Sequence, residues 1–267
     1  MNYYDFLDFL DFKIRNKDLN TIQSLDKEIF EPHILIYASE KSVYYNCPEI
    51  TDYLLSIDHH NLINKQAIIL GAIKANQYEI VKMILEKYFL DPQILKAAIS
   101  EIVKFKQKDG LLALIETGKL PQLILDHALI EAIFWGHDEI VLLMLKMGAN
   151  AAARDDYPII LASKLGRLEI IRDLIRKGAD VHVKGDLPVR KAAYNGYMKL
   201  VKLLIYYGAD VTCISFSALK KQCGHRDSII SYVEKAINRP RLVKRYRYPP
   251  VWSDRRRKCE QLIDAEN

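Results

Sequence analysis

The chain is poor in the residues that would indicate a secreted, membrane-spanning or zinc-binding protein. Four cysteines occur in 267 residues, and none lies at the C-x-x-C spacing of a zinc or redox site. We therefore expect reduced thiols in an intracellular protein. No apolar run approaches the roughly 18 residues that would span a membrane. The N-terminus carries three aspartates and lacks the basic region of a signal peptide.

The signatures of common enzyme classes are also missing. The sequence contains no phosphate-binding glycine loop, dinucleotide fingerprint or nucleophile elbow. His59 and His60 are adjacent, so they point to different sides of a helix, and no Cys or His partner lies at ligand spacing. The pair Asp155–Asp156 falls in a turn, where helix capping explains it better than acid–base catalysis. The sequence predicts no enzymatic activity, no metal and no cofactor.

The positive charge is confined to one segment. Residues 239–267 hold nine Lys/Arg and four Asp/Glu, which leaves 30 of each sign in residues 1–238 and a net charge of +5 for the chain. The basic residues of interest in this tail are Arg245, Arg247, Arg255, Arg256, Arg257 and Lys258. Basic residues among Tyr and Trp can bind nucleic acid or act as a nuclear import signal. An acidic protein or membrane surface, or simple packing on the last repeat, are the alternatives.

What the sequence does contain is a repeat. Glycines occur at strictly equal spacing, at Gly136, Gly166 and Gly196. A second set has the same spacing and is followed each time by Ala and then Asn or Asp, at Gly148, Gly178 and Gly208. Self-similarity with a period of about 30 residues indicates a solenoid, in which each unit buries its apolar face only against its neighbours. Such a chain has no single central core, so we expect a binding surface instead of a catalytic cleft.

Each unit is predicted to form two helices. In the unit at 156–180, Pro158 stands in the first turn of one helix, where its missing N–H costs nothing, and Gly166 ends that helix. An apolar stripe from Leu168 to Ile175 follows at helical spacing. Gly178 ends the second helix.

These units resemble ankyrin repeats. The family pattern Thr-Pro-Leu-His-x-Ala-Ala, Gly-His-x-Glu-Ile-Val and Gly-Ala-Asp is similar to Leu187-Pro188-Val189-Arg190-Lys191-Ala192-Ala193, Gly136-His137-Asp138-Glu139-Ile140-Val141 and Gly208-Ala209-Asp210. The period is about 30 residues, against about 33 in the family. The resemblance therefore implies an all-α ankyrin solenoid of helix-turn-helix units whose inter-repeat fingers are clipped to short turns. Short repeats of this kind are similar to the ankyrin arrays of giant DNA viruses of amoebae.

The register extends beyond the regular units. We predict a divergent capping unit at 1–30, an ankyrin array of about seven units at 31–238 and a basic extension at 239–267. In the unit that begins at Glu31, about four extra residues around Tyr44–Cys47 predict an inserted loop between the two helices. Residues 96–120 are predicted to be the weakest internal link, because Lys106 replaces the glycine between helices.

The resemblance implies a non-catalytic protein interaction module. In the family the partner lies along the concave face, which includes the exposed end of each first helix. By register, these positions are Lys104, Phe105, Phe134, Trp135, Lys164, Leu165, Tyr194 and Asn195. The alternative for Phe134 and Trp135 is that they only cover adjacent helices. The partner is expected to be a protein, of the host if the chain is viral, and no membrane is expected. The alternative function is nucleic-acid binding through the tail.

Overall fold

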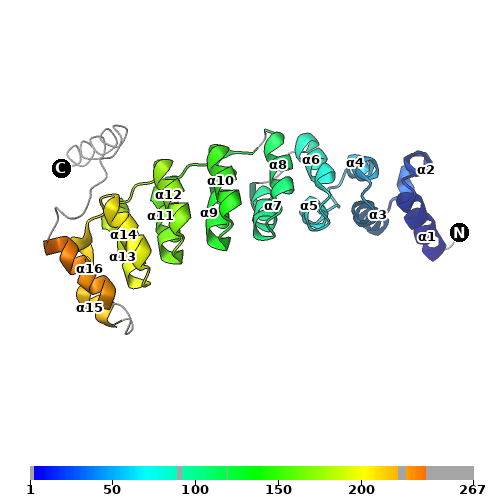
Figure 1. Ribbon diagram of the computed structural model, residues 1–267. Coiled ribbons are helices and arrows are strands. Elements are labelled where there is room, and N and C mark those ends of the chain that lie inside the picture. The colour runs from blue at the N-terminus through cyan, green and yellow to red at the C-terminus, as the bar shows by residue number, and fades with distance from the viewer. Residues whose placement is uncertain (1–2, 89–91, 119, 222–226, 239–267) are drawn as a thin grey trace, which may run out of the picture. The chain divides into compact units, whose positions relative to one another are not determined.

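The structure is a computed structural model that describes residues 3–88, 92–118, 120–221 and 227–238 (Figure 1). All regular secondary structure within these ranges is helical, as the sequence predicts. Backbone contacts divide the chain into two compact units, Met1–Ala128 and Leu129–Asn267. No helix in the described ranges is long and apolar enough to cross a membrane.

The first unit consists of successive helix pairs. Its helices are α1 (Tyr3–Arg15), α2 (Leu19–Ser24), the 3₁₀ helix η1 (Lys27–Ile29), α3 (Pro32–Tyr44), α4 (Pro48–Ile57), α5 (Lys65–Lys74), α6 (Tyr78–Lys87), α7 (Pro92–Lys104), α8 (Lys108–Glu116) and the first part of α9 (Gln122–Trp135). First helices contact first helices of the next pair, in the order α1, α3, α5 and α7. Second helices do the same, from α2 to α4, α6 and α8. Each pair therefore buries its apolar side chains against its neighbours, as expected of a solenoid.

The second unit repeats this arrangement. It contains the end of α9, then α10 (Asp138–Lys146), α11 (Ala153–Leu165), α12 (Leu168–Arg176), α13 (Val183–Tyr194), α14 (Met198–Tyr206), the 3₁₀ helix η2 (Val211–Cys213), α15 (Phe216–Lys221) and α16 (Asp227–Asn238). The contacts run from α11 to α13 and α15, and from α10 to α12, α14 and α16 (Figure 1). Small side chains such as Ala162 and Ala192 are fully buried where first helices meet, and their size allows close helix packing.

One backbone position recurs once per repeat in both units. The residue in the middle of the connection between the two helices of a pair has a positive φ, and these equally spaced residues are Asn46, Asn76, Lys106, Gly136, Gly166 and Gly196. A left-handed conformation suits glycine because a Cβ crowds the following carbonyl oxygen. Asparagine tolerates this region better than other residues, whereas lysine does not. Lys106 therefore takes the place of the glycine, as the sequence predicts, with φ +55°.

The predicted inserted loop around Tyr44–Cys47 is wrong. The connection between α3 and α4 is Tyr45–Cys47, the same length as the connection Ala75–Gln77 between α5 and α6. Asn46 lies one repeat period before Asn76 and also has a positive φ. The sequence contains no insertion here, because asparagine occupies the place that the pattern reserves for glycine.

The clipped turns between repeats have a distinctive backbone. Three successive residues with positive φ, Arg154–Asp156, lead into the regular part of α11, and Lys184–Asp186 do the same for α13 in the next repeat. Each triplet is a single left-handed turn that replaces a hairpin finger. Left-handed residues other than glycine cost about 1–2 kcal/mol each, so other contacts must stabilise these turns.

Candidate interaction surface

The helix register explains why certain residues at the ends of first helices face outward. In α9, Ala132 and Ile133 are buried, and the next two residues complete the turn on the opposite side of the helix. Phe134 is 53% exposed and Trp135 is 41% exposed. The chain then reverses at Gly136 with φ +74°. Both aromatic side chains are therefore accessible at the end of α9.

Phe134 and Trp135 form a defined pair. Their ring centroids are 5.3 Å apart with an interplanar angle of 86°, an edge-to-face contact. The indole Nε1 of Trp135 donates a hydrogen bond to Oε2 of Glu131 at 3.2 Å, which holds the ring along the helix. Exposed aromatic residues held in one orientation are suited to a binding surface, because little side-chain entropy is lost when a partner binds.

In the next two repeats, the corresponding ends of the first helices, α11 and α13, are linked by a hydrogen bond. Lys164 is exposed and Leu165 half-buried at the end of α11, and Asn195 is exposed directly after α13. The amide Nδ2 of Asn195 donates to the carbonyl oxygens of Lys164 at 3.3 Å and Lys191 at 3.0 Å. Tyr194 is half-buried, and its hydroxyl oxygen accepts from the amide of Ser215 at 3.4 Å. The structure thus brings Lys164 and Asn195 together, while Tyr194 has a partly structural role.

Arg167 and Tyr197 occupy equivalent positions, and neither was selected from the sequence. A Cβ on Gly136 would lie 2.4 Å from Cζ of Arg167, and a Cβ on Gly166 would lie 2.7 Å from Cζ of Tyr197. Each side chain therefore lies over the reversing glycine of the preceding repeat. Their place directly after a glycine, in successive repeats, was the available signal.

The first unit has its own exposed positions in this register. Phe105 is 54% exposed, and Nζ of Lys104 lies 5.2 Å from its ring centroid. Tyr44 is 74% exposed and occupies the same register position as Lys104 and Phe134. Tyr44 could not be placed from the sequence, because the predicted insertion shifted the register of this repeat. Beside it, Tyr45 donates a hydrogen bond to Oδ2 of Asp11 at 2.9 Å, which raises the pKa of the phenol.

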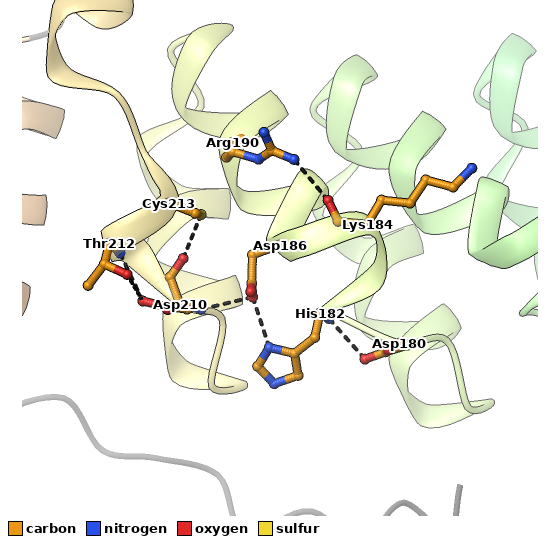
Figure 2. A network of polar contacts seen from close by, with 8 residues as sticks. All are labelled: Asp180, His182, Lys184, Asp186, Arg190, Asp210, Thr212 and Cys213. Carbon is orange, nitrogen blue, oxygen red and sulfur yellow. Dashed lines mark hydrogen bonds and ion pairs between the residues drawn. The ribbon is translucent and has the colours of Figure 1, made fainter. Parts of the chain in front are cut away.

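The turns of the second unit are held by aspartates that bond to the next repeat (Figure 2). Oδ1 of Asp186 accepts from the amide of Asp210 at 2.9 Å, and Oδ1 of Asp156 accepts from the amide of Asp180 at 2.8 Å. Nδ1 of His182 also lies 2.9 Å from Oδ1 of Asp186. The carboxylate of Asp156, predicted to cap a helix, thus also binds the backbone of the next repeat.

The match to known families agrees with this geometry. A family model of ankyrin repeats matches residues 129–215 as three copies. Those residues are ankyrin repeats. The described helix pairs and their regular period make the fold an all-α ankyrin repeat solenoid. A search of curated proteins finds no match to the chain.

The ankyrin repeats offer little that resembles a reactive site. Burial, followed by the charge of Asp186, raises the pKa of Cys213 to about 11. Its thiol therefore stays protonated at neutral pH and donates to the carbonyl oxygen of Asp210 at 2.8 Å. Within the described ranges, no three or more His, Cys, Asp or Glu side chains gather as metal ligands would. Nε2 of His127 lies 3.0 Å from Oγ of Ser100 on the helix α7.

The basic tail falls outside the described residues. Its six basic positions, Arg245, Arg247, Arg255, Arg256, Arg257 and Lys258, all lie within 239–267. Their predicted roles rest on the sequence. Ankyrin repeats are generally protein–protein interaction modules and typically non-catalytic, so the class of function follows from the repeats at 129–215.

Proposed function

We propose that the chain is a non-catalytic interaction module whose partner protein binds the outward-facing first-helix ends of the second unit. The surface, here called the helix-end row, consists of Phe134, Trp135, Lys164, Leu165, Tyr194 and Asn195. The observation that carries the proposal is the exposed edge-to-face pair of Phe134 and Trp135. Tryptophan and tyrosine are among the residues most enriched at interface hot spots, and both rings of this pair are exposed.

A hydrogen-bonded link between two repeats supports the helix-end row as a binding surface. Asn195 links the ends of α11 and α13 through its bonds to the carbonyls of Lys164 and Lys191. This link holds the ends of α11 and α13 together, and pre-ordering of this kind lowers the entropic cost of association. In the first unit, the same positions of the repeat are occupied by Tyr44 on α3 and by Lys104 and Phe105 at the end of α7.

The test compares matched exposed aromatics. Trp135→Ala is expected to abolish capture of the cellular partner, since truncating a hot-spot residue costs about 2 kcal/mol or more. The control is Tyr206→Ala, because Tyr206 is 43% exposed at the end of the second helix α14 and pairs edge-to-face with Tyr207. That variant should capture the partner normally. Both variants should retain the thermal unfolding midpoint of the parent.

Tyr194→Ala reports on the second position of the row. Its hydroxyl contacts Ser215, so we expect a small loss of stability together with weaker capture. A variant that captures the partner normally would remove Tyr194 from the surface. If both Trp135→Ala and Tyr194→Ala unfold, these side chains are structural and the proposal fails.

The partner is proposed to be a protein of the host cell, on the basis of the likeness in repeat length to giant-virus ankyrin arrays. The competing proposal, that the chain binds nucleic acid through its tail, is supported by nine basic residues among 239–267. Replacing the six basic tail positions by glutamine separates the two. A helix-end binder keeps its partner, whereas a tail binder loses it and shows affinity that falls steeply between about 50 and 200 mM salt. The same substitutions test nuclear import of the chain from the cytoplasm.

A further inference from the structure

The cations beside the helix-end row lack acidic partners. Lys164 and Arg167 flank the turn that ends α11, and Lys191 lies in α13 beside Asn195. No carboxylate of the described residues lies within ion-pair distance of these three side chains. The helix that follows is different. In α12, Arg172 pairs with Glu169 at 3.2 Å, and Arg176 pairs with Asp173 at 3.0 Å.

One of the three cations lies beside the aromatic pair, and the other two lie near the ends of the next two first helices, α11 and α13. Nδ2 of Asn195 donates hydrogen bonds to the backbone carbonyls of both Lys164 and Lys191, so the backbone segments that carry these two lysines are linked through one side chain. The guanidinium of Arg167 lies over Gly136, the residue that follows Trp135. Its Nε is buried without a hydrogen-bond partner. Three cations without acidic partners therefore accompany the exposed aromatic pair on successive first helices of the second unit.

We propose that the helix-end row recognises an acidic segment of its partner protein. Carboxylates of the segment would meet Lys164, Lys191 and Arg167, and an apolar or aromatic side chain would pack on Phe134 and Trp135. This inference rests on the proposed function and specifies the chemistry of its partner. Charge complementarity of this kind selects partners and accelerates their association. Arginine with free terminal N–H groups is suited to bidentate binding of a carboxylate.

An acidic residue beside Trp135, Glu131, favours a protein segment over a nucleic acid as the ligand. The carboxylate of Glu131 accepts from the indole N–H of Trp135, so it stands beside the ring on which a base would stack. A phosphate backbone that follows stacked bases would be repelled there. An acidic peptide can place its carboxylates on Lys164 and Lys191 and an uncharged residue on Trp135.

The experiment uses a fluorescent random copolymer of glutamate and tyrosine as the probe, with fluorescence anisotropy of the full-length protein as the measurement. The variant Lys164→Glu/Lys191→Glu reverses the charge of one cation in the helix-end row and of one cation beside it. Its matched control is Arg172→Glu/Arg176→Glu, which makes the same change of net charge on α12. We expect the first variant to lose about tenfold or more in affinity, and the control to lose less than about threefold. The thermal unfolding midpoint of each variant should stay near that of the parent.

Three results would overturn the inference. Equal losses in both double variants would show that only net charge matters. No loss in either would show that the copolymer binds elsewhere. Tighter binding of a single-stranded oligothymidylate than of the copolymer, lost in Lys164→Glu/Lys191→Glu, would make the surface a nucleic-acid site.

The proposed function can survive that failure. If the copolymer does not bind while Trp135→Ala still abolishes capture of the cellular partner, the surface is correct and its acidic ligand is wrong. If Trp135→Ala retains both the copolymer and the cellular partner, the proposed function fails as well.

Discussion

The first unit and the ankyrin repeats at 129–215 build the same backbone from different residues. Between the two helices of a pair, the second unit uses Gly136, Gly166 and Gly196 at positive φ, whereas the first unit uses Asn76 and Lys106 among others. The repeat period is therefore a property of the backbone that persists where the glycines do not. Only the glycine-containing part is matched by the family model.

The difference teaches how each unit stabilises that backbone. In the first unit a side chain supplies the bonds: Nε2 of Gln107 donates to the carbonyl of Ile73 and to Oδ1 of Asn76, both at 3.0 Å. In the second unit the equivalent side chains are Arg167, which lies over Gly136, and Tyr197, which lies over Gly166. Glycine there serves two purposes, because it allows positive φ and leaves room for the side chain above it.

The largest effect is expected where glycine serves both purposes. Gly166→Ala places a Cβ at φ +72° and 2.7 Å from the ring of Tyr197. The conformational cost of about 1–2 kcal/mol and an overpacking cost of about 1–3 kcal/mol should together destabilise the second unit by about 2–5 kcal/mol. Chemical denaturation followed by circular dichroism measures it.

The matched control is Gly178→Ala. Gly178 has φ +102°, and an added Cβ would meet nothing within 4 Å. Its cost should be the conformational part alone, about 1–2 kcal/mol. Adding Tyr197→Ala to Gly166→Ala should recover part of the loss. Equal losses of stability in Gly166→Ala and Gly178→Ala would show that the Tyr197 side chain moves aside without a measurable energetic cost.

A smaller loss is expected from the turn aspartates of the second unit. Asp186→Ala removes the acceptor of the Asp210 amide and should cost about 1.5–3 kcal/mol, the usual contribution of a hydrogen bond to a charged group. Asp186→Asn keeps an acceptor oxygen and tolerates positive φ, so it should cost less than half as much. Asp155→Ala is the control, since Asp155 shares the left-handed conformation but makes only a 3.9 Å ion pair with Lys184. Equal costs for Asp155→Ala and Asp186→Ala would contradict the bond between repeats as the cause.

Amide hydrogen exchange should show that the ankyrin repeats at 129–215 are locally more stable than the first unit. Amides around Ile140–Val141 and Ile170–Ile171 are expected to exchange about tenfold more slowly than those around Ile102–Val103, because Lys106 strains the joint after α7. The side chains of Ile102 and Val103 are fully buried, however, and Gln107 ties the joint to the preceding repeat. Equal or reversed protection would mean that this packing and these bonds fully offset the strain.

The parts of the fold that follow from local rules could be predicted from the sequence. The helix pairs of the second unit follow from the apolar stripe after Leu168 and the reversing Gly166, and the turn at Lys106 follows from the period. The register at Asn46 was missed, because asparagine can adopt positive φ without the signal that glycine gives. The bond from Asp156 to the Asp180 amide was missed too, because it depends on the left-handed turn at Arg154–Asp156, which no local preference favours. The same register error hid Tyr44 from the candidate surface.

The smallest change in stability is expected when a residue at positive φ in the first unit is replaced by the glycine that the second unit uses at that position. Lys106→Gly relieves about 1–2 kcal/mol of left-handed strain but makes the unfolded chain more flexible, which costs about 0.4–1 kcal/mol. The net result should be stabilisation by about 0.5–1 kcal/mol, measured by denaturation of the full-length protein. Asn76→Gly should do the opposite, because Oδ1 of Asn76 accepts bonds from Tyr78 and Gln107 that glycine cannot replace. If both variants were stabilised, strain alone would govern this position. If Lys106→Gly were destabilised, the lysine side chain would contribute more to the joint than its conformation costs.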